Sequence, residues 1–170
     1  FNAPQKYWDL YSESSIEMPS NDIQINNFPE MAKIGAGELW AQSDIPSVKS
    51  ADFSESLVKK LIHGYYASVS YVDAQIGRVL YLGLSENTII VFWSDHGYFL
   101  GENGFWCKQS NYKLSLNIPL IIYSPNIKGG TKVKGLVESV DIFPTLCEMV
   151  GISKPFHLQG DSFLDLLNNT

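Results

Sequence analysis

The segment with the most evident chemistry is Ser94-Asp95-His96-Gly97. Asp95 offers carboxylate oxygens and His96 offers a ring nitrogen, and proteins use both groups to bind divalent metal ions. The segment directly follows an apolar, β-branched run over 88–93, which predicts a strand buried on both faces. Because ligands bind beside the carboxyl ends of strands in open α/β sheets, we predict that Asp95 and His96 are metal ligands. An aspartate that only caps the turn after the strand would give the same pattern.

A cation follows in the next loop, where Lys108 ends the segment Gly-Glu-Asn-Gly-Phe-Trp-Cys-Lys over 101–108. Two glycines and two aromatic residues within eight positions predict a shaped loop. A lysine beside a divalent cation would create an anion site, because both charges stabilise a bound oxyanion. Most lysines are solvated surface charges, so Lys108 is assigned this role only together with Asp95 and His96.

The longest predicted element is a helix that ends near Leu80. Asp52 and Glu55 have the spacing of a capping box at its start. Apolar residues then recur at helical spacing, and Gly83 stands where a C-terminal cap belongs.

Further predicted elements alternate along the chain. A second apolar run over 118–123 predicts another buried strand, and 132–137 is a weaker candidate for a third. A helix is predicted over 140–150, with Pro144 in its first turn, and a short helix over 160–168.

Helix, buried strand, loop, buried strand and helix is the order of an α/β fold. We therefore predict a single domain over 1–170, with its core in 51–170. Residues 1–50 contain four prolines and many polar breaks, which predict an irregular excursion that packs over other parts of the protein.

Composition excludes several classes of protein. The chain has 170 residues, of which 45% are hydrophobic and 13% aromatic, so it can close a core and is not disordered. Its net charge of −6 disfavours a nucleic-acid partner, and no apolar run is long enough to predict a membrane span. Residues 1–20 show no signal-peptide pattern and begin with Phe1, so we expect a part of a longer protein.

Several motifs together resemble the type I sulfatase family. They are Ser-Asp-His-Gly after a strand, the loop 101–108, Ile118-Pro119-Leu120-Ile121, the segment Val-Asp-Ile-Phe-Pro-Thr-Leu over 140–146 and Gly-Asp-Ser-Phe-Leu over 160–164. With the start Phe-Asn-Ala-Pro over 1–4, they are most similar to the iduronate-2-sulfatase branch. The resemblance covers residues 1–12 and about 54–167.

This resemblance implies a sulfuric ester hydrolase with an alkaline-phosphatase-like α/β/α sandwich, of which the chain is the C-terminal part. The central sheet would be mostly parallel. By motif position, Asp95 and His96 would bind the metal, and Lys108 would contact the sulfate, so that Lys108 and His96 are the catalytic candidates. The family uses calcium, or less often magnesium, together with a formylglycine nucleophile. The branch implies a carbohydrate sulfate as substrate and an exported location, which is periplasmic, secreted or lysosomal.

The chain lacks two parts of the family's active site. It contains no Cys/Ser-x-Pro-x-Arg motif, from which formylglycine is made, and no Asp-Asp metal pair. We expect both before Phe1, in the remainder of the sulfatase domain, and we expect the chain alone to be inactive. A phosphodiesterase or phosphonate hydrolase of the same superfamily, or a non-catalytic remnant, is the alternative, and the upstream nucleophile would distinguish them.

Overall fold

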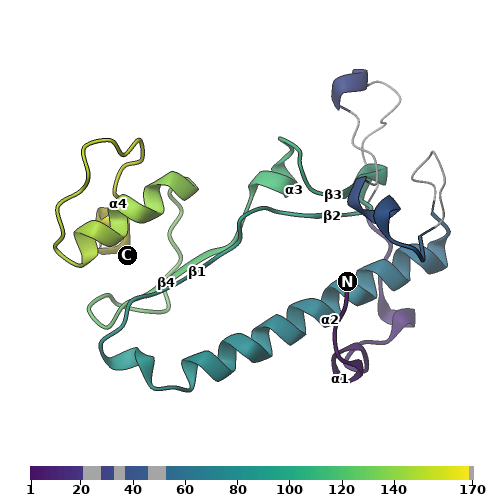
Figure 1. Cartoon of the computed structure of the whole chain (residues 1–170), viewed down its shortest axis with the longest axis horizontal. Coiled ribbons are helices and arrows are strands. Elements are labelled where there is room, and N and C mark those ends of the chain that lie inside the picture. The colour runs from purple at the N-terminus through teal and green to yellow at the C-terminus, as the bar shows by residue number, and fades with distance from the viewer. Residues whose placement is uncertain (21–27, 33–36, 46–52, 169–170) are drawn as a thin grey trace. The chain divides into compact units, whose positions relative to one another are not determined.

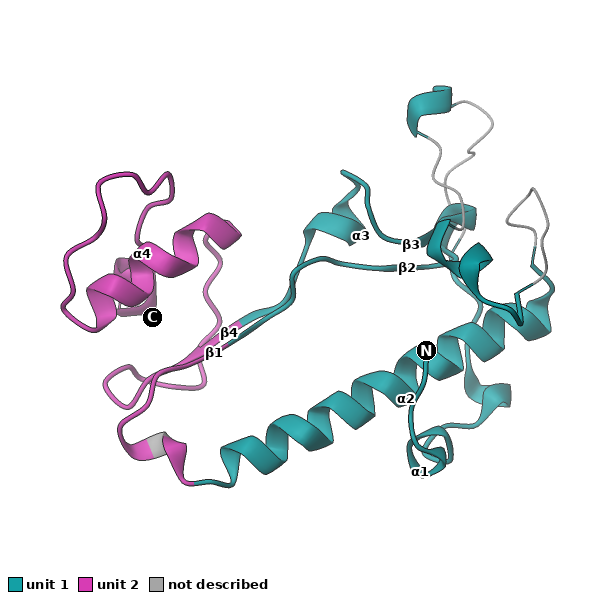
Figure 2. Cartoon of the chain, in the orientation of Figure 1, with its two compact units in different colours: residues 1–82, 92–120 teal, residues 83–91, 121–170 magenta. Residues whose placement is uncertain are grey.

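The computed structural model divides the chain into two compact units (Figure 2). Unit 1 comprises residues 1–82 and 92–120, and unit 2 comprises 83–91 and 121–170. The structure describes residues 1–20, 28–32, 37–45 and 53–168. None of the described helices combines the length and apolar character that a membrane span requires.

Helix α2, Glu55–Leu80, is the longest element of unit 1 (Figure 1). Its N-terminus is capped by Ser54, whose Oγ accepts a hydrogen bond from the Leu57 backbone N–H at 3.3 Å. The predicted helix is therefore confirmed, but its N-cap is Ser54, and Asp52 lies outside the described residues. Its C-cap is Tyr81 and not the predicted Gly83. A salt bridge of 2.7 Å between Glu55 and Lys59 supports the first turns.

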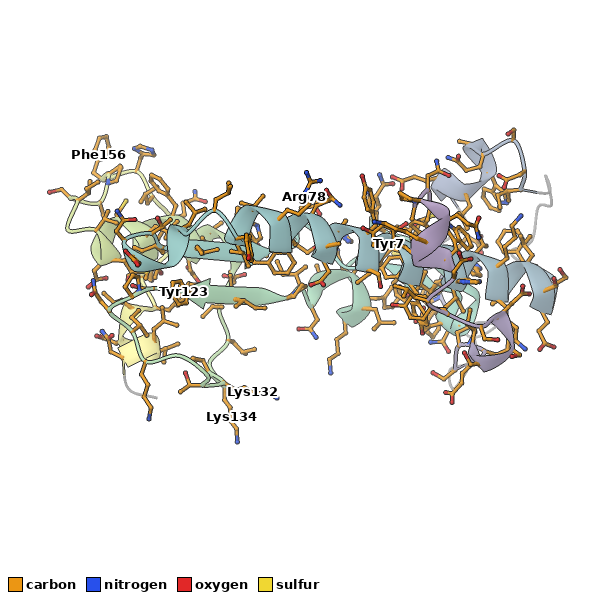
Figure 3. All side chains as sticks on the ribbon, turned by 90° about the horizontal axis from the view of Figure 1, so that it is seen from below. Tyr7, Arg78, Tyr123, Lys132, Lys134 and Phe156 are labelled. Atoms are coloured by element: carbon orange, nitrogen blue, oxygen red, sulfur yellow. The ribbon has the colours of Figure 1, made fainter. Side chains whose placement is uncertain are left out.

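The N-terminal segment packs against α2. Helix α1, Gln5–Trp8, places Tyr7 5.2 Å from Tyr71 between ring centroids (Figure 3). Gly64 of α2 allows this approach, because a Cβ there would lie 2.9 Å from the Trp8 ring. The other described helices before α2 are short 3-10 turns: η1 Glu13–Ser15, η3 Glu30–Ala32 and η4 Gly37–Ala41.

The core of unit 1 joins the N-terminal segment, α2 and a short hairpin. Strands β2, Phe99–Leu100, and β3, Trp106–Cys107, pair antiparallel around the turn η6, Glu102–Gly104. The buried cluster consists of Ile16, Leu39, Ile45, Val58, Ile62, Trp106 and Cys107. Trp106 is 2% exposed, so the bulk of the loop after Asp95 is anchored in this core.

Strands β1, Ile90–Trp93, and β4, Leu120–Tyr123, form a two-stranded sheet. Both predicted strands are confirmed, although each is shorter than its apolar run. The expected burial on both faces is wrong for this chain, since Trp93 is 48% exposed and Ile121 is 62% exposed. The physical reason is that the described sheet has two strands only, which cannot enclose their own apolar faces.

No strand forms over 132–137, where the sequence predicted a weak one. The described residues offer this segment no neighbouring strand, and it runs as a loop between β4 and α4, Ser139–Met149. Lys132 and Lys134 extend from this loop (Figure 3). Gly135 packs closely on α5, because a Cβ there would lie 2.6 Å from the Leu166 side chain.

Helix α4 and the short helix α5, Leu164–Asn168, are joined through a buried hydroxyl. The Thr145 side chain is fully buried; its Oγ1 donates to the Asp141 carbonyl at 2.6 Å and accepts from the Phe163 N–H at 3.0 Å. Both predicted helices are confirmed, but Pro144 lies in the second turn of α4 and not in the first, and α5 begins at Leu164 and not at 160. The helix begins at Ser139 because Glu138 and Asp141 form a capping box.

Candidate active site

The loop after β1 is a tight turn built around Asp95. The Ser94 hydroxyl donates to the His96 carbonyl at 2.7 Å, and the His96 N–H donates to the Ser94 hydroxyl at 3.4 Å. The Ser94 N–H donates to the Pro119 carbonyl at 3.3 Å, so the turn begins where the β1–β4 pairing ends. The Ser94 side chain thus forms the hydrogen bonds that hold the backbone of the turn around Asp95.

Gly97 fixes the far end of the turn by close packing. Its N–H donates to the Ser115 carbonyl at 2.7 Å, and a Cβ on Gly97 would lie only 1.8 Å from the Leu114 carbonyl oxygen. The position therefore requires the absence of a side chain, and not a left-handed backbone. The loop is thereby held against α3, Lys113–Leu116.

The half-buried imidazole of His96 is held in one tautomer. Its Nδ1 lies 2.8 Å from the Gly97 carbonyl oxygen. Because a carbonyl oxygen only accepts, Nδ1 carries a proton, and in the neutral ring the lone pair is on Nε2. Histidines that bind metals usually have this arrangement, in which the second ring nitrogen donates to a backbone carbonyl.

The Asp95 side chain is exposed, and no hydrogen bond to its carboxylate is found among the described residues. An aspartate that caps a turn would accept a backbone N–H with its side chain, and in this turn Ser94 has that role. The Asp95 carboxylate therefore keeps its oxygens for another ligand.

The backbone around Lys108 is strained. Lys108 directly follows β3, and its two neighbours, Cys107 and Gln109, have left-handed φ angles of 69° and 72°. This conformation costs a non-glycine residue about 1–3 kcal/mol and is typical of functional loops. The register pairs Phe99 with Cys107, so its continuation by one residue places Lys108 opposite Tyr98, two residues from His96.

The observed partner of Lys108 is Glu38 of η4, whose Oε1 lies 3.7 Å from Nζ. No contact of Lys108 with Asp95 or His96 is found among the described residues. Glu38 had no signal in the sequence, because it lies seventy positions away in an irregular segment. The structure thus brings together Asp95 and His96 in one turn, and Lys108 and Glu38 in a neighbouring pair.

Tyr98 is the other group near Lys108 that the sequence did not single out. Burial raises the pKa of the Tyr98 phenol, and a hydrogen bond with Cys107 and the charge of Glu38 raise the pKa further. Tyr98 also lies 5.7 Å from Tyr65 between ring centroids, which ties the start of β2 to α2.

The chemistry of Asp95 and His96 fits a divalent cation, with one exposed carboxylate and one oriented imidazole. Within the part of the chain that the structure describes, no group of three His, Cys, Asp or Glu side chains could hold a metal ion. Calcium takes six to eight oxygen ligands. A calcium ion at this turn would thus require most of its ligands from outside the described residues.

A family model of sulfatases matches residues 1–152. A sulfatase of Formosa agariphila is 38% identical over 160 residues, which are 88% of this chain and 30% of the relative. Human iduronate 2-sulfatase is 30% identical over 196 residues, which are 96% of this chain and 36% of the relative. The chain thus spans about a third of the length of these relatives.

Two solved structures support the same grouping. A phosphonate monoester hydrolase of Silicibacter pomeroyi superposes with a TM-score of 0.82 at 27% identity, covering 98% of this chain and 34% of that one. A protein solved with its substrate D-glucosamine-2-N,6-O-disulfate superposes with a TM-score of 0.63 at 36% identity, covering 69% and 26%. The chain is mixed α/β and shares part of the alkaline-phosphatase-like fold of these proteins. Taken with the family match over most of its length, this shows that the chain belongs to the sulfatase family.

Proposed function

We propose that the chain supplies the cation-binding turn and the sulfate-binding lysine of a sulfatase that hydrolyses a carbohydrate sulfate. The observation that carries this proposal is the turn 94–97, in which the Gly97 carbonyl holds Nδ1 of His96 and leaves Nε2 for a ligand beside the exposed carboxylate of Asp95. The remainder of the sulfatase domain would supply the nucleophile and further metal ligands. The larger mostly parallel sheet, of which β1 and β4 are members, belongs to the same proposal, as does a single domain over 1–170.

Each residue has a distinct role in this proposal. Asp95 and His96 would hold a calcium ion, or less favourably magnesium, and Lys108 would donate hydrogen bonds to the peripheral sulfate oxygens. A bound calcium ion would polarise the sulfate ester, and formylglycine would supply the attacking oxygen. Lys108 stabilises the negative charge that grows while the S–O bond to the sugar breaks. The overall reaction consumes one water and releases the sugar hydroxyl and sulfate.

The location is a proposal on the resemblance alone: an exported protein, in the periplasm, outside the cell or in a lysosome. The sugar portion of the substrate is supported by a similar protein that was solved with a glucosamine disulfate as its substrate.

The test is steady-state kinetics of the complete sulfatase domain that contains this chain, with 4-nitrocatechol sulfate as substrate. Asp95→Asn should abolish most turnover, because it removes a charged ligand of the ion. Asp73→Asn, an exposed aspartate on α2, is the matched control and should keep full activity. An Asp95→Asn enzyme as active as the control would refute the assignment.

A phosphonate hydrolase is the second candidate, because the solved phosphonate monoester hydrolase covers 98% of this chain. The same enzyme should therefore be assayed with a phenyl phosphonate monoester. A sulfatase should show the higher kcat/KM on the aryl sulfate. The opposite ranking would favour the phosphonate hydrolase, and no turnover of either ester would favour a non-catalytic remnant.

A further inference from the structure

We propose that Glu38 is a specificity-determining residue that favours neutral or amino sugars and disfavours uronic acids as carriers of the sulfate. This inference rests on the proposed role of Lys108 as the sulfate-binding residue. It concerns the part of the substrate next to the sulfate, for which neither the resemblance nor the motifs name a residue.

The distance between Lys108 and Glu38 allows the lysine to bind an anion while the glutamate remains next to it. Their charged atoms lie 3.7 Å apart, with 38% of the Lys108 side chain and 48% of the Glu38 side chain exposed. A charge-assisted hydrogen bond would measure about 2.7–2.9 Å. The lysine ammonium therefore keeps N–H donors for a sulfate, and both side chains are partly exposed among the described residues.

The backbones of both charged residues are attached to the same core, which keeps the two positions close together. Leu39, the neighbour of Glu38 in η4, is 6% exposed and belongs to the buried cluster that contains Trp106 and Cys107. Cys107 in turn is the neighbour of Lys108.

A sulfate held by Lys108 would bring the substituents of its sugar ring close to the Glu38 carboxylate. A hydroxyl or ammonium group there can donate a hydrogen bond to Glu38, whereas a uronate carboxylate would be repelled. Both kinds of sugar occur among the similar proteins. One relative is named for iduronate, and one solved structure holds a glucosamine disulfate as its substrate. The charge of Glu38 favours the second kind for this protein.

The test compares two ligands that differ in one group. Glucoside 2-sulfate carries a CH2OH group where glucuronide 2-sulfate carries a carboxylate. Each is measured as a competitor of 4-nitrocatechol sulfate turnover by the complete domain, and the corresponding 3-sulfates provide a second pair. The wild-type enzyme should bind the glucoside sulfate more tightly than the glucuronide sulfate.

Glu38→Gln should narrow this gap about tenfold, which corresponds to about 1.4 kcal/mol, mainly by improving binding of the glucuronide. Glu38→Asp, which keeps the charge, should retain the preference. Glu55→Gln, which removes the pair with Lys59 on α2 and leaves the pair of Lys108 with Glu38 intact, should change nothing.

Two results would overturn the inference separately from the proposed function. An active wild-type enzyme that binds the two sugars equally, or a gap unchanged in Glu38→Gln, would remove Glu38 as a specificity residue and leave the sulfatase assignment standing. A wild-type enzyme that does not turn over 4-nitrocatechol sulfate would remove both.

Discussion

The imidazole Nδ1 of His96 donates a hydrogen bond to the carbonyl oxygen of Gly97, at 2.8 Å. The bond joins two neighbouring residues, so the turn itself determines which nitrogen is protonated.

The tautomer is directly measurable. In the neutral form, nitrogen-15 NMR should show the His96 proton on Nδ1, because the Gly97 carbonyl can only accept. His157, a histidine of unit 2, serves as the internal reference. A proton on Nε2 of His96 would contradict the proposed arrangement, because that nitrogen could then not bind a cation.

Gly97→Ala should destabilise the protein by about 2 kcal/mol, because a Cβ would collide with the Leu114 carbonyl oxygen. Gly77→Ala is the matched control: Gly77 lies within α2 with open space around its Cβ position, so alanine should stabilise the helix by about 0.5–1 kcal/mol. Urea denaturation of both variants measures the difference. Equal stability of the two would show that the loop shifts away from α3 without penalty.

Lys108→Ala should lower kcat/KM for an aryl sulfate about a hundredfold, or about 3 kcal/mol, in the complete domain. The melting temperature should change little, since an ion pair as exposed as that with Glu38 contributes about 0–1 kcal/mol. Lys113→Ala, an exposed lysine of α3, is the control and should keep wild-type kinetics. Loss of stability without loss of turnover would make Lys108 a structural residue.

Tyr98 should make the protein sensitive to alkaline pH. Burial raises the pKa of its phenol above the usual value of about 10, so the folded state holds the proton longer than the unfolded state. The resulting stability is complete below pH 10 and is lost as the pH rises further, by up to about 1.4 kcal/mol per pH unit.

Urea denaturation between pH 8 and pH 11 tests this dependence. The alkaline loss should be smaller in Tyr98→Phe than in the wild type, whereas Tyr81→Phe, at a side chain that is 93% exposed, should leave it unchanged. Parallel curves for the wild type and Tyr98→Phe would disprove the assignment.

The elements of the chain were largely predictable from local patterns. The stripe of apolar residues identified α2, and the runs over 88–93 and 118–123 identified β1 and β4. The hydrophobic pattern does not tell how many further strands and helices cover this sheet. The prediction that both faces are buried was therefore wrong at Trp93 and Ile121. The segment 132–137 has strand-like residues, but pairing depends on a partner strand and not on the segment itself.

The candidate site was predictable only in part. Asp95 and His96 are neighbours in sequence and follow a strand, so their proximity required no tertiary information. The pairing of Lys108 with Glu38 depends on how the N-terminal segment folds over β3, which leaves no periodic trace in the sequence. The left-handed backbone at Cys107 and Gln109 was equally hidden, because neither residue type favours that conformation.

The open sheet of β1 and β4 has a consequence for handling the protein. Each described strand has a single hydrogen-bonded neighbour, so each presents an unpaired edge beside exposed side chains such as Phe92 and Ile121. Unprotected edges of this kind recruit strands from other molecules, which leads to aggregation. The 170-residue chain produced alone is thus expected to need solubilising conditions or a chaperone, whereas production together with the remainder of its sulfatase domain should yield soluble material.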